Sequence, residues 1–325
     1  MQNSGQVGGG GCSLPQVHTN LMVQVTYGRT FFVAELIGPI IASEKHMEKK
    51  MIYIIGMSHA INVLKAMTLK EMSVTHENLS EVRSDEDFFE VEVAAIHNFN
   101  HKVKAYIVSP KSGWGNVAEF SVNKNGNIKI NAAQGYVNLI DKIEKSNSTE
   151  VYSFFNGNEH SALSMIQKYE PYDFYLPWRD DLEFLQGHQP VNFTIIRKQM
   201  QDALNPTIAS LILMRTNLPN VKIYHVMPPP PVESAKSIKE NPEIFKSILE
   251  SFGITPFAIR YKYYLLAAEI IKNSLKPYDI KIVDSPKQAE NSNGSLMEEY
   301  RFAATHANEK YGSLVVKQIQ MGASA

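Results

Sequence analysis

The chain has 325 residues, of which 44% are hydrophobic and 20% are charged, a composition typical of a globular protein. Its formal net charge of -1 gives no electrostatic reason to expect nucleic-acid or membrane-surface binding. The single cysteine, Cys12, excludes an internal disulfide framework and a cysteine-rich zinc site. The most apolar early stretch, Leu21 to Ala42, is interrupted by Arg29 and Glu35, so we expect no membrane span, no signal peptide and a cytoplasmic location.

The first fifty residues differ in character from the rest of the chain. Residues 1 to about 20 are polar and glycine-rich, which is typical of a flexible tail. The next thirty show no clear strand or helix period and end in the charged cluster Glu48-Lys49-Lys50. We therefore predict an N-terminal extension over residues 1-50, partly flexible, and a functional domain over residues 51-325.

The domain opens with a pattern that places a serine at a sheet edge. Ile52 to Ile55 form a short apolar run typical of a buried strand, and Gly56 permits a sharp turn. From His59 onward, apolar residues recur at helical spacing. Ser58 is thus predicted at the carboxyl end of a strand and at a helix N-terminus, where ligands bind in open α/β sheets. The alternative is that Ser58 only caps the helix.

The same unit of strand, turn and helix recurs farther along the chain. Further strands are predicted over 87-96, 103-109, 151-155, 221-226 and 280-283, with a hairpin or irregular excursion over 120-130. Helices are predicted from Gly135, then over 159-169, 191-214, 238-252, 257-274 and 308-319. This order predicts a three-layer α/β/α sandwich with a central parallel sheet.

Two segments between these elements have unusual composition. Pro171 to His188 is aromatic and irregular, which is typical of a loop packed over the core or, alternatively, of a pocket wall. Pro228 to Pro231 predicts a stiff loop near the sheet edge, although such a run can also bind a partner that recognises polyproline.

Three separated blocks are predicted on the same edge of the sheet. They are Gly56-Met57-Ser58, Gly157-Asn158 and Thr305-His306-Ala307-Asn308. Together they supply a nucleophile, a carboxamide donor and a base, which is what acyl transfer at a serine requires. With a glycine that opens a helix, Gly135, and with Tyr311-Gly312, these blocks follow the order found in the SGNH hydrolases, the group that includes GDSL-type esterases and lipases. The chain resembles that family over residues 51 to about 320.

The resemblance implies a flavodoxin-like SGNH hydrolase fold and a role for each matching position. Ser58 is implied as the nucleophile and His306 as the general base. The oxyanion hole is implied to consist of the backbone N–H groups of Ser58 and Gly135 and the side-chain amide of Asn158. Such chemistry needs no cofactor, and the histidine spacing predicts no metal site.

One position departs from the family pattern. The aspartate that usually stands three residues before the catalytic histidine is replaced here by Ala303. Because an orienting carboxylate can contribute about four orders of magnitude to a serine triad, the sequence predicts a Ser58–His306 dyad with a substituted third member. A backbone carbonyl is one candidate for the third member, and the others are the carboxylates of Asp284, Glu298 and Glu299.

The predicted function is hydrolysis of carboxylic esters, including carbohydrate O-acetyl esters, through an acyl-serine intermediate. The partner is therefore a small-molecule or carbohydrate ester substrate. An O-acyltransferase that uses the same serine is one alternative, and a catalytically degenerate member that binds a carbohydrate or a protein is another. Asn158 and His306 also have ordinary interpretations as turn and helix-start residues. His59 and His160, beside two of the blocks, are predicted to be pocket residues.

Overall fold

The computed structural model describes residues 51–67, 88–91, 102–108, 117–146, 148–155, 159–167 and 170–323. The predicted extension over residues 1-50 lies outside these ranges, so the proposed domain boundary stays a prediction. Within the described ranges, no helix is both long enough and apolar enough to cross a membrane.

The elements follow the predicted alternation of strands and helices. The strands are β1 (Met51–Gly56), β2 (Phe88–Val91), β3 (Lys102–Val108), β4 (Ala118–Val122), β5 (Ile128–Ala132), β6 (Ser148–Phe154), β7 (Tyr172–Asp173), β8 (Gln189–Pro190), β9 (Lys222–Val226) and β10 (Lys281–Val283). The α-helices are α1 (Ser58–Met67), α2 (Gln134–Glu144), α3 (Glu159–Ser164), α4 (Phe193–Asn217), α5 (Ala235–Glu240), α6 (Lys246–Phe252), α7 (Phe257–Leu275) and α8 (Glu309–Ala323). Short 3₁₀ helices, labelled η, cover Glu243–Phe245 (η2), Lys276–Tyr278 (η3), Lys287–Ala289 (η4) and Glu298–Tyr300 (η5).

The central sheet has the strand order β10-β9-β6-β1-β3-β2. Pairing is parallel from β10 through to β3, whereas β2 runs antiparallel to β3. The α/β architecture is therefore confirmed, but the sheet is mixed rather than wholly parallel. A single antiparallel edge strand is a common feature of such sheets.

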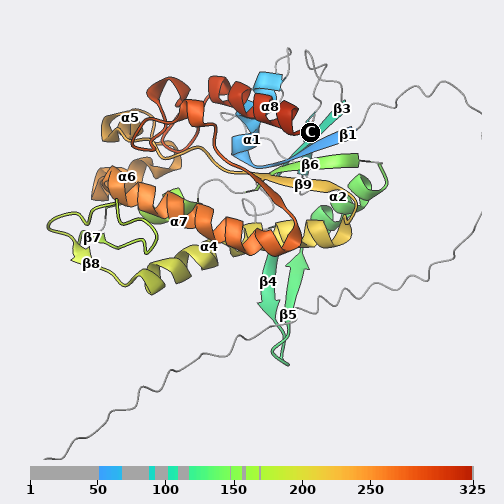
Figure 1. Ribbon diagram of the computed structural model, residues 1–325, viewed down its shortest axis with the longest axis horizontal. Helices are drawn as coiled ribbons and strands as arrows, with labels where there is room; N and C mark the ends of the chain where they lie inside the picture. The colour runs from blue at the N-terminus through green and yellow to red at the C-terminus, as the bar shows by residue number, and fades with distance from the viewer. Residues whose placement is uncertain are drawn as a thin grey trace, which may run out of the picture.

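The sheet lies between two layers of helices (Figure 1). Side chains of β1 alternate between the layers: Tyr53 and Ile55 pack on the side of α2, α4 and α7, and Ile52 and Ile54 on the side of α1 and α8. This alternation follows from the two-residue period of a strand, and burial on both faces explains why the run is apolar throughout. Three layers are thus confirmed.

The β4–β5 hairpin, predicted as a hairpin or excursion, forms its own two-stranded sheet and extends away from the central one (Figure 1). At its tip, Gly126 has a φ of 77°, and the Asn123 side chain accepts hydrogen bonds from Asn125 N and Asn127 N. The turn chemistry read from the sequence is therefore present.

The predicted helix over 238-252 was wrong as a single element. The chain instead forms α5, then η2, then α6, with the break at Asn241 and Pro242. Proline lacks a backbone N–H donor and disfavours helical backbone at the residue before it, so a helix cannot continue smoothly through this point. After the break, Glu243 adopts the left-handed backbone region, with a φ of 54°.

The two unusual loops both pack onto the body of the protein. Pro228 to Pro231 are buried, so this run is not presented to a partner and the stiff-loop interpretation holds. In the aromatic segment, the carboxylate of Asp173 is fully buried and pairs with the ammonium of Lys262, on α7, at 2.8 Å. Tyr172 also shares a 2.6 Å hydrogen bond with Tyr263. These contacts fix the segment on α7.

A buried histidine predicts acid-sensitive stability. His225, on β9, is fully buried, and its two ring nitrogens have no hydrogen-bond partner among the described residues. Burial lowers the pKa of His225 to about 4. The unfolded chain, with an ordinary histidine pKa of about 6.5, therefore binds the proton more readily, and stability is lost as the pH falls from about 6.5 towards 4.

We expect His225 alone to lower the free energy of unfolding by about 2 kcal/mol between pH 7 and pH 5, at about 1.4 kcal/mol per pH unit below 6.5. Urea unfolding at the two pH values measures this loss. His225→Leu should reduce the difference, and His188→Gln, a change at a partly exposed histidine, should leave it as in the wild type. An undiminished difference in His225→Leu would assign the acid sensitivity to other groups.

Candidate active site

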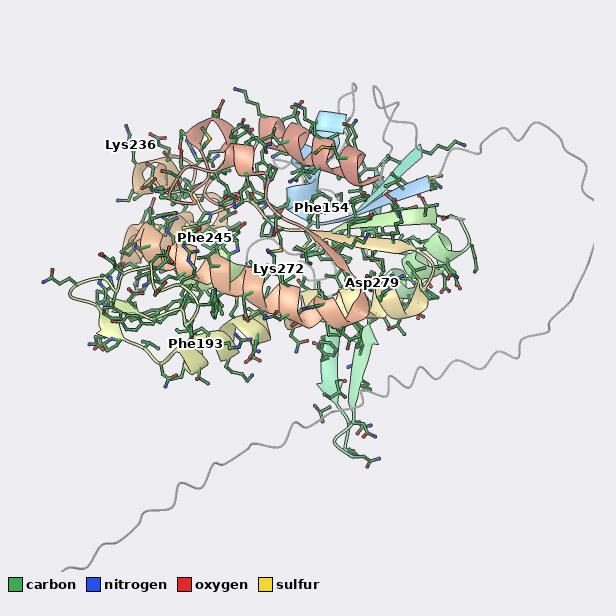
Figure 2. All side chains as sticks on the ribbon, in the orientation of Figure 1. Phe154, Phe193, Lys236, Phe245, Lys272 and Asp279 are labelled. Atoms are coloured by element: carbon green, nitrogen blue, oxygen red, sulfur yellow. The ribbon has the colours of Figure 1, made fainter. Side chains whose placement is uncertain are left out.

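Ser58 is the first residue of α1 and follows directly on the turn that ends β1. The turn runs close against the neighbouring strand: a Cβ on Gly56 would lie 2.4 Å from Phe154 Cβ and 2.9 Å from Phe154 O. Met57 N also donates to Phe154 O at 3.3 Å. Glycine is therefore required at position 56, and the close approach fixes Ser58 at the carboxyl edge of the sheet. Phe154 lies in the interior of the molecule, in contrast to the outward-facing Lys236 (Figure 2).

His306 contacts the serine. Its Nε2 atom lies 2.7 Å from Ser58 Oγ, although the two residues are 248 positions apart in the sequence. The imidazole is buried, and it stacks on the ring of His59 with centroids 4.5 Å apart. The predicted nucleophile and the predicted base are thus within hydrogen-bonding distance of each other.

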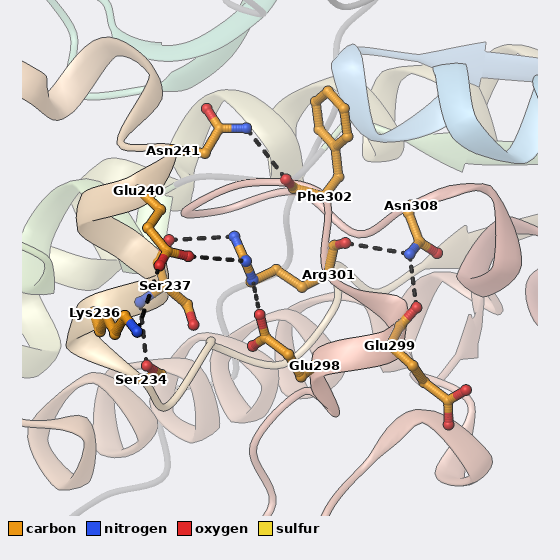
Figure 3. A network of polar contacts seen from close by, with 10 residues as sticks. All are labelled: Ser234, Lys236, Ser237, Glu240, Asn241, Glu298, Glu299, Arg301, Phe302 and Asn308. Carbon is orange, nitrogen blue, oxygen red and sulfur yellow. Dashed lines mark hydrogen bonds and ion pairs between the residues drawn. The ribbon is translucent and has the colours of Figure 1, made fainter.

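The loop that carries His306 is folded back on itself. Phe302 N donates to His306 O at 2.9 Å, and Asn308 N donates to Tyr300 O at 2.7 Å. The side-chain amide of Asn308 adds bonds to the carbonyls of Glu299 and Arg301 (Figure 3). These contacts hold both ends of the loop together across the histidine.

A second set of contacts ties the same loop to α5. The Arg301 guanidinium pairs with Glu298 at 2.6 Å and with Glu240 at 3.8 Å (Figure 3). Asn241 Nδ2 donates to Phe302 O at 3.2 Å, and Ala304 N donates to Asn241 O at 2.9 Å. The two hydrogen bonds of Asn241 are the closer contacts between the end of α5 and the histidine loop.

Glu243 completes the arrangement from that segment. Its Oε1 atom makes a hydrogen bond with His306 Nδ1. Its Oε2 atom accepts hydrogen bonds from Thr305 N and Thr305 Oγ1, both at 2.8 Å. A carboxylate at Nδ1 favours the tautomer that carries its proton on Nδ1 and presents a lone pair on Nε2 to Ser58.

The surroundings of Glu243 keep it ionised. Burial alone would raise the pKa of its carboxyl group. The hydrogen bond and electrostatic interaction with His306, together with the two hydrogen bonds from Thr305, lower the pKa by more than burial raises it. The pKa of Glu243 therefore lies below its ordinary value. The left-handed backbone of Glu243 costs about 1–2 kcal/mol for a residue with a Cβ. Strained backbone of this kind is concentrated at functional sites.

The carboxylate of Glu243 thus contacts His306 where the sequence leaves the third member open. It comes from none of the three candidates: Asp284 pairs with Lys272, Glu298 pairs with Arg301, and Glu299 offers its carbonyl to Asn308. Ala303 is fully buried, and its N–H donates to His306 O at 3.1 Å.

The sequence contained one signal for Glu243 that the prediction did not use. Asn241-Pro242 is a turn-forming dipeptide inside the predicted helix, and it marked the point where the chain changes direction. Glu243 and His306 are 63 positions apart in the sequence, so no local sequence pattern predicts their contact.

The remaining predicted site residues are those of the oxyanion hole, and the structure describes some of them but not all. Asn158 lies outside the described residues. Gly135 is the second residue of α2, which follows the β4–β5 hairpin, and its neighbour Tyr136 is fully buried, with its hydroxyl donating to Ser210 O at 2.8 Å. The contributions of Gly135 and Asn158 to an oxyanion hole stay predictions. As the first residue of α1, Ser58 has a backbone N–H at the positive end of a helix, where no carbonyl of the same helix can accept it.

The two neighbouring histidines have different surroundings. His59 stacks on His306 and therefore lies next to the group formed by Ser58, His306 and Glu243. His160 is buried, with its ring 5.3 Å from that of Tyr264, and burial, followed by the charge of Arg260, lowers its pKa to about 4. Across the part of the chain that the structure describes, no group of three or more His, Cys, Asp or Glu side chains is arranged to hold a metal ion.

No protein-family model matches the chain, and neither does any curated protein. Among solved structures, the chain is similar to the periplasmic domain of a lipopolysaccharide acetyltransferase from Salmonella ser. Paratyphi A (12% identity, 86% of this chain and 85% of that chain covered, TM-score 0.41). It is also similar to a GDSL-like lipase from Bacteroides thetaiotaomicron (11%, 84% and 89%, 0.37) and to a carbohydrate acetylesterase from Sinorhizobium meliloti (9%, 85% and 99%, 0.37).

At identities near 10% and TM-scores below 0.5, these similarities assign neither a family nor an activity to this chain. The contacts among Ser58, His306 and Glu243 are the stronger observation.

Proposed function

We propose that this protein is a serine esterase that hydrolyses carboxylic esters through an acyl-Ser58 intermediate. The observation that carries the proposal is the hydrogen-bonded series from Ser58 Oγ through both ring nitrogens of His306 to the Glu243 carboxylate. A serine hydroxyl is a weak nucleophile until a base accepts its proton, and an imidazole held by a carboxylate is such a base.

The reaction proceeds in two steps. Ser58 Oγ attacks the ester carbonyl carbon while His306 Nε2 takes the hydroxyl proton. The bond to the alcohol then breaks, and His306 returns that proton to the departing alkoxide. In the second step water attacks the acyl-serine, His306 accepts a proton from the water, and this proton returns to Ser58 Oγ as the acid leaves. Throughout, Glu243 stabilises the transient imidazolium. The Ser58 N–H at the start of α1 is one donor for the oxyanion.

Glu243 also bears on the alternative of a degenerate binding protein. The replacement of the usual aspartate by Ala303 favours such a protein only if no carboxylate contacts His306, and Glu243 makes that contact. The acyltransferase alternative uses the same triad and differs only in the acceptor of the acyl group. Carbohydrate O-acetyl esters are the natural substrates that we propose, and transesterified product with added sugar acceptors would identify a transferase.

A fluorophosphonate probe tests the proposal, because it labels only an activated serine. We expect one label per chain, mapped by peptide mass spectrometry to Ser58, and none in Ser58→Ala. Ser234→Ala is a matched control: Ser234 is an ordinary cap of α5, with its side chain accepting from Ser237 N at 3.1 Å, and its loss should not affect labelling. An unlabelled wild-type protein, or a label elsewhere, would support the interpretation of Ser58 as a helix cap.

A further inference from the structure

Thr305 contacts both of the residues that would activate Ser58. Its backbone N–H and its hydroxyl each lie 2.8 Å from Glu243 Oε2. Its hydroxyl oxygen is also 3.1 Å from His306 Nδ1. Among the described residues, only the Thr305 side chain makes a hydrogen bond to both Glu243 and His306.

The chemistry of a hydroxyl group assigns a direction to these bonds. Thr305 Oγ1 has one proton, and Glu243 Oε2, as part of an ionised carboxylate, can only accept it. The lone pairs of Oγ1 are then available to the Nδ1–H of His306. The hydroxyl therefore donates to Oε2 of Glu243 and accepts from the Nδ1–H of His306. Oε1 of Glu243 accepts from that same N–H group.

Both oxygens of Glu243 are consequently held. Oε1 faces His306, and Oε2 faces two donors from the residue next to His306. Without these donors, a glutamate side chain with three rotatable bonds could turn Oε1 away from Nδ1. These donors matter more because Glu243 belongs to a separate segment of the chain. It directly follows Pro242, and its backbone is left-handed.

We propose that Thr305 is a positioning residue that locks the Glu243 carboxylate against His306. This proposal rests on the proposed function, since it concerns the same Ser58 chemistry. Thr305 does not touch the reacting atoms of the substrate. It acts by keeping the imidazole in the orientation and tautomer that accept the Ser58 proton, so its loss should lower kcat and leave KM nearly unchanged.

Kinetics with p-nitrophenyl acetate, measured for single and double variants, test the proposal. Thr305→Val keeps the shape of the side chain and the backbone donor but removes the hydroxyl, and we expect it to lower kcat by about 10- to 100-fold, as for loss of one bond to a charged group. Thr305→Ser restores the hydroxyl and should stay within about threefold of the wild type. Thr216→Val is the control, because Thr216 is exposed at the end of α4 and bonds only locally, to Ile212 O at 2.9 Å.

The double variant Glu243→Gln/Thr305→Val distinguishes positioning from a general structural effect. If Thr305 acts through Glu243, its substitution should lower kcat by less than about threefold once Glu243 is already replaced. Full additivity of the two losses would overturn the proposal, as would undiminished turnover in Thr305→Val or failure of Thr305→Ser to restore it.

Failure of the proposed function would look different. In that case Ser58→Ala would turn over the ester as fast as the wild type, or neither would turn it over. Inactivity of the wild type would overturn the positioning role together with the esterase. Turnover that depends on Ser58 but not on Thr305 would overturn the positioning role alone.

Discussion

Replacing Glu243 by glutamine is expected to lower kcat for an activated acetyl ester by about 10³- to 10⁴-fold, with little change in KM. Glutamine has nearly the same shape, but its neutral amide cannot stabilise the imidazolium that forms when His306 accepts the Ser58 proton. Its NH₂ group can also donate to Nδ1, which would place the imidazole proton on Nε2, facing Ser58. Loss of the corresponding carboxylate in a well-characterised serine triad has an effect of about 10⁴-fold.

The matched control for this change is Glu240→Gln. Glu240 lies three residues earlier, at the end of α5, and its carboxylate pairs with Arg301 at 3.8 Å and with Lys236 at 4.0 Å rather than with His306. The same change of chemistry there should leave kcat within about threefold of the wild type, since the pairs of Glu240 are half-exposed and weak. Steady-state kinetics of the two variants, with circular dichroism to verify folding, measure the difference. Equal activity of Glu243→Gln and wild type would show that His306 needs no carboxylate and that Ser58 and His306 act without a third member.

The parts of this site that the sequence predicted are those encoded by local patterns. The apolar run before Gly56 and the helical period after Ser58 are enough to place a serine at the carboxyl edge of the sheet, and β1 and α1 confirm that placement. The order of strand and helix also predicted the layers. The order of elements did not predict that β2 is antiparallel to β3, because the residue pattern of an edge strand does not indicate the direction in which it pairs.

The third member of the triad could not be predicted in the same way. In the family pattern the carboxylate stands at position 303, and the sequence otherwise offers a backbone carbonyl or the carboxylates near His306 and after the last strand. Glu243 stands instead in a stretch whose apolar spacing is helical on both sides of Pro242. Its role depends on the φ of one residue and on contacts with Thr305 and His306, which arise only in the folded chain.

Replacing Asp173 by alanine is expected to have the largest effect on stability, lowering the free energy of unfolding by about 3–5 kcal/mol, as for one partner of a buried ion pair. The side chains of Asp173 and Lys262 are 0% and 1% exposed. The carboxylate also accepts hydrogen bonds from Phe174 N at 2.7 Å and Leu185 N at 2.9 Å, so its loss would leave those donors unpaired. Of its hydrogen bonds, Lys262 would keep the one to the carbonyl of Glu183, at 3.0 Å.

Urea unfolding at pH 7 measures this loss. Two further variants show whether it comes from the buried ion pair. Asp181→Ala removes an exposed carboxylate of the same loop, paired with Arg179, and should leave the unfolding midpoint nearly unchanged. The double variant Asp173→Leu/Lys262→Met removes both buried charges and should recover most of the loss, because an apolar pair avoids the cost of taking two ions out of water. If the double variant were as unstable as Asp173→Ala, the backbone donors of Phe174 and Leu185 would account for the effect, and the carboxylate would act as an anchor for the loop rather than as a partner for the lysine.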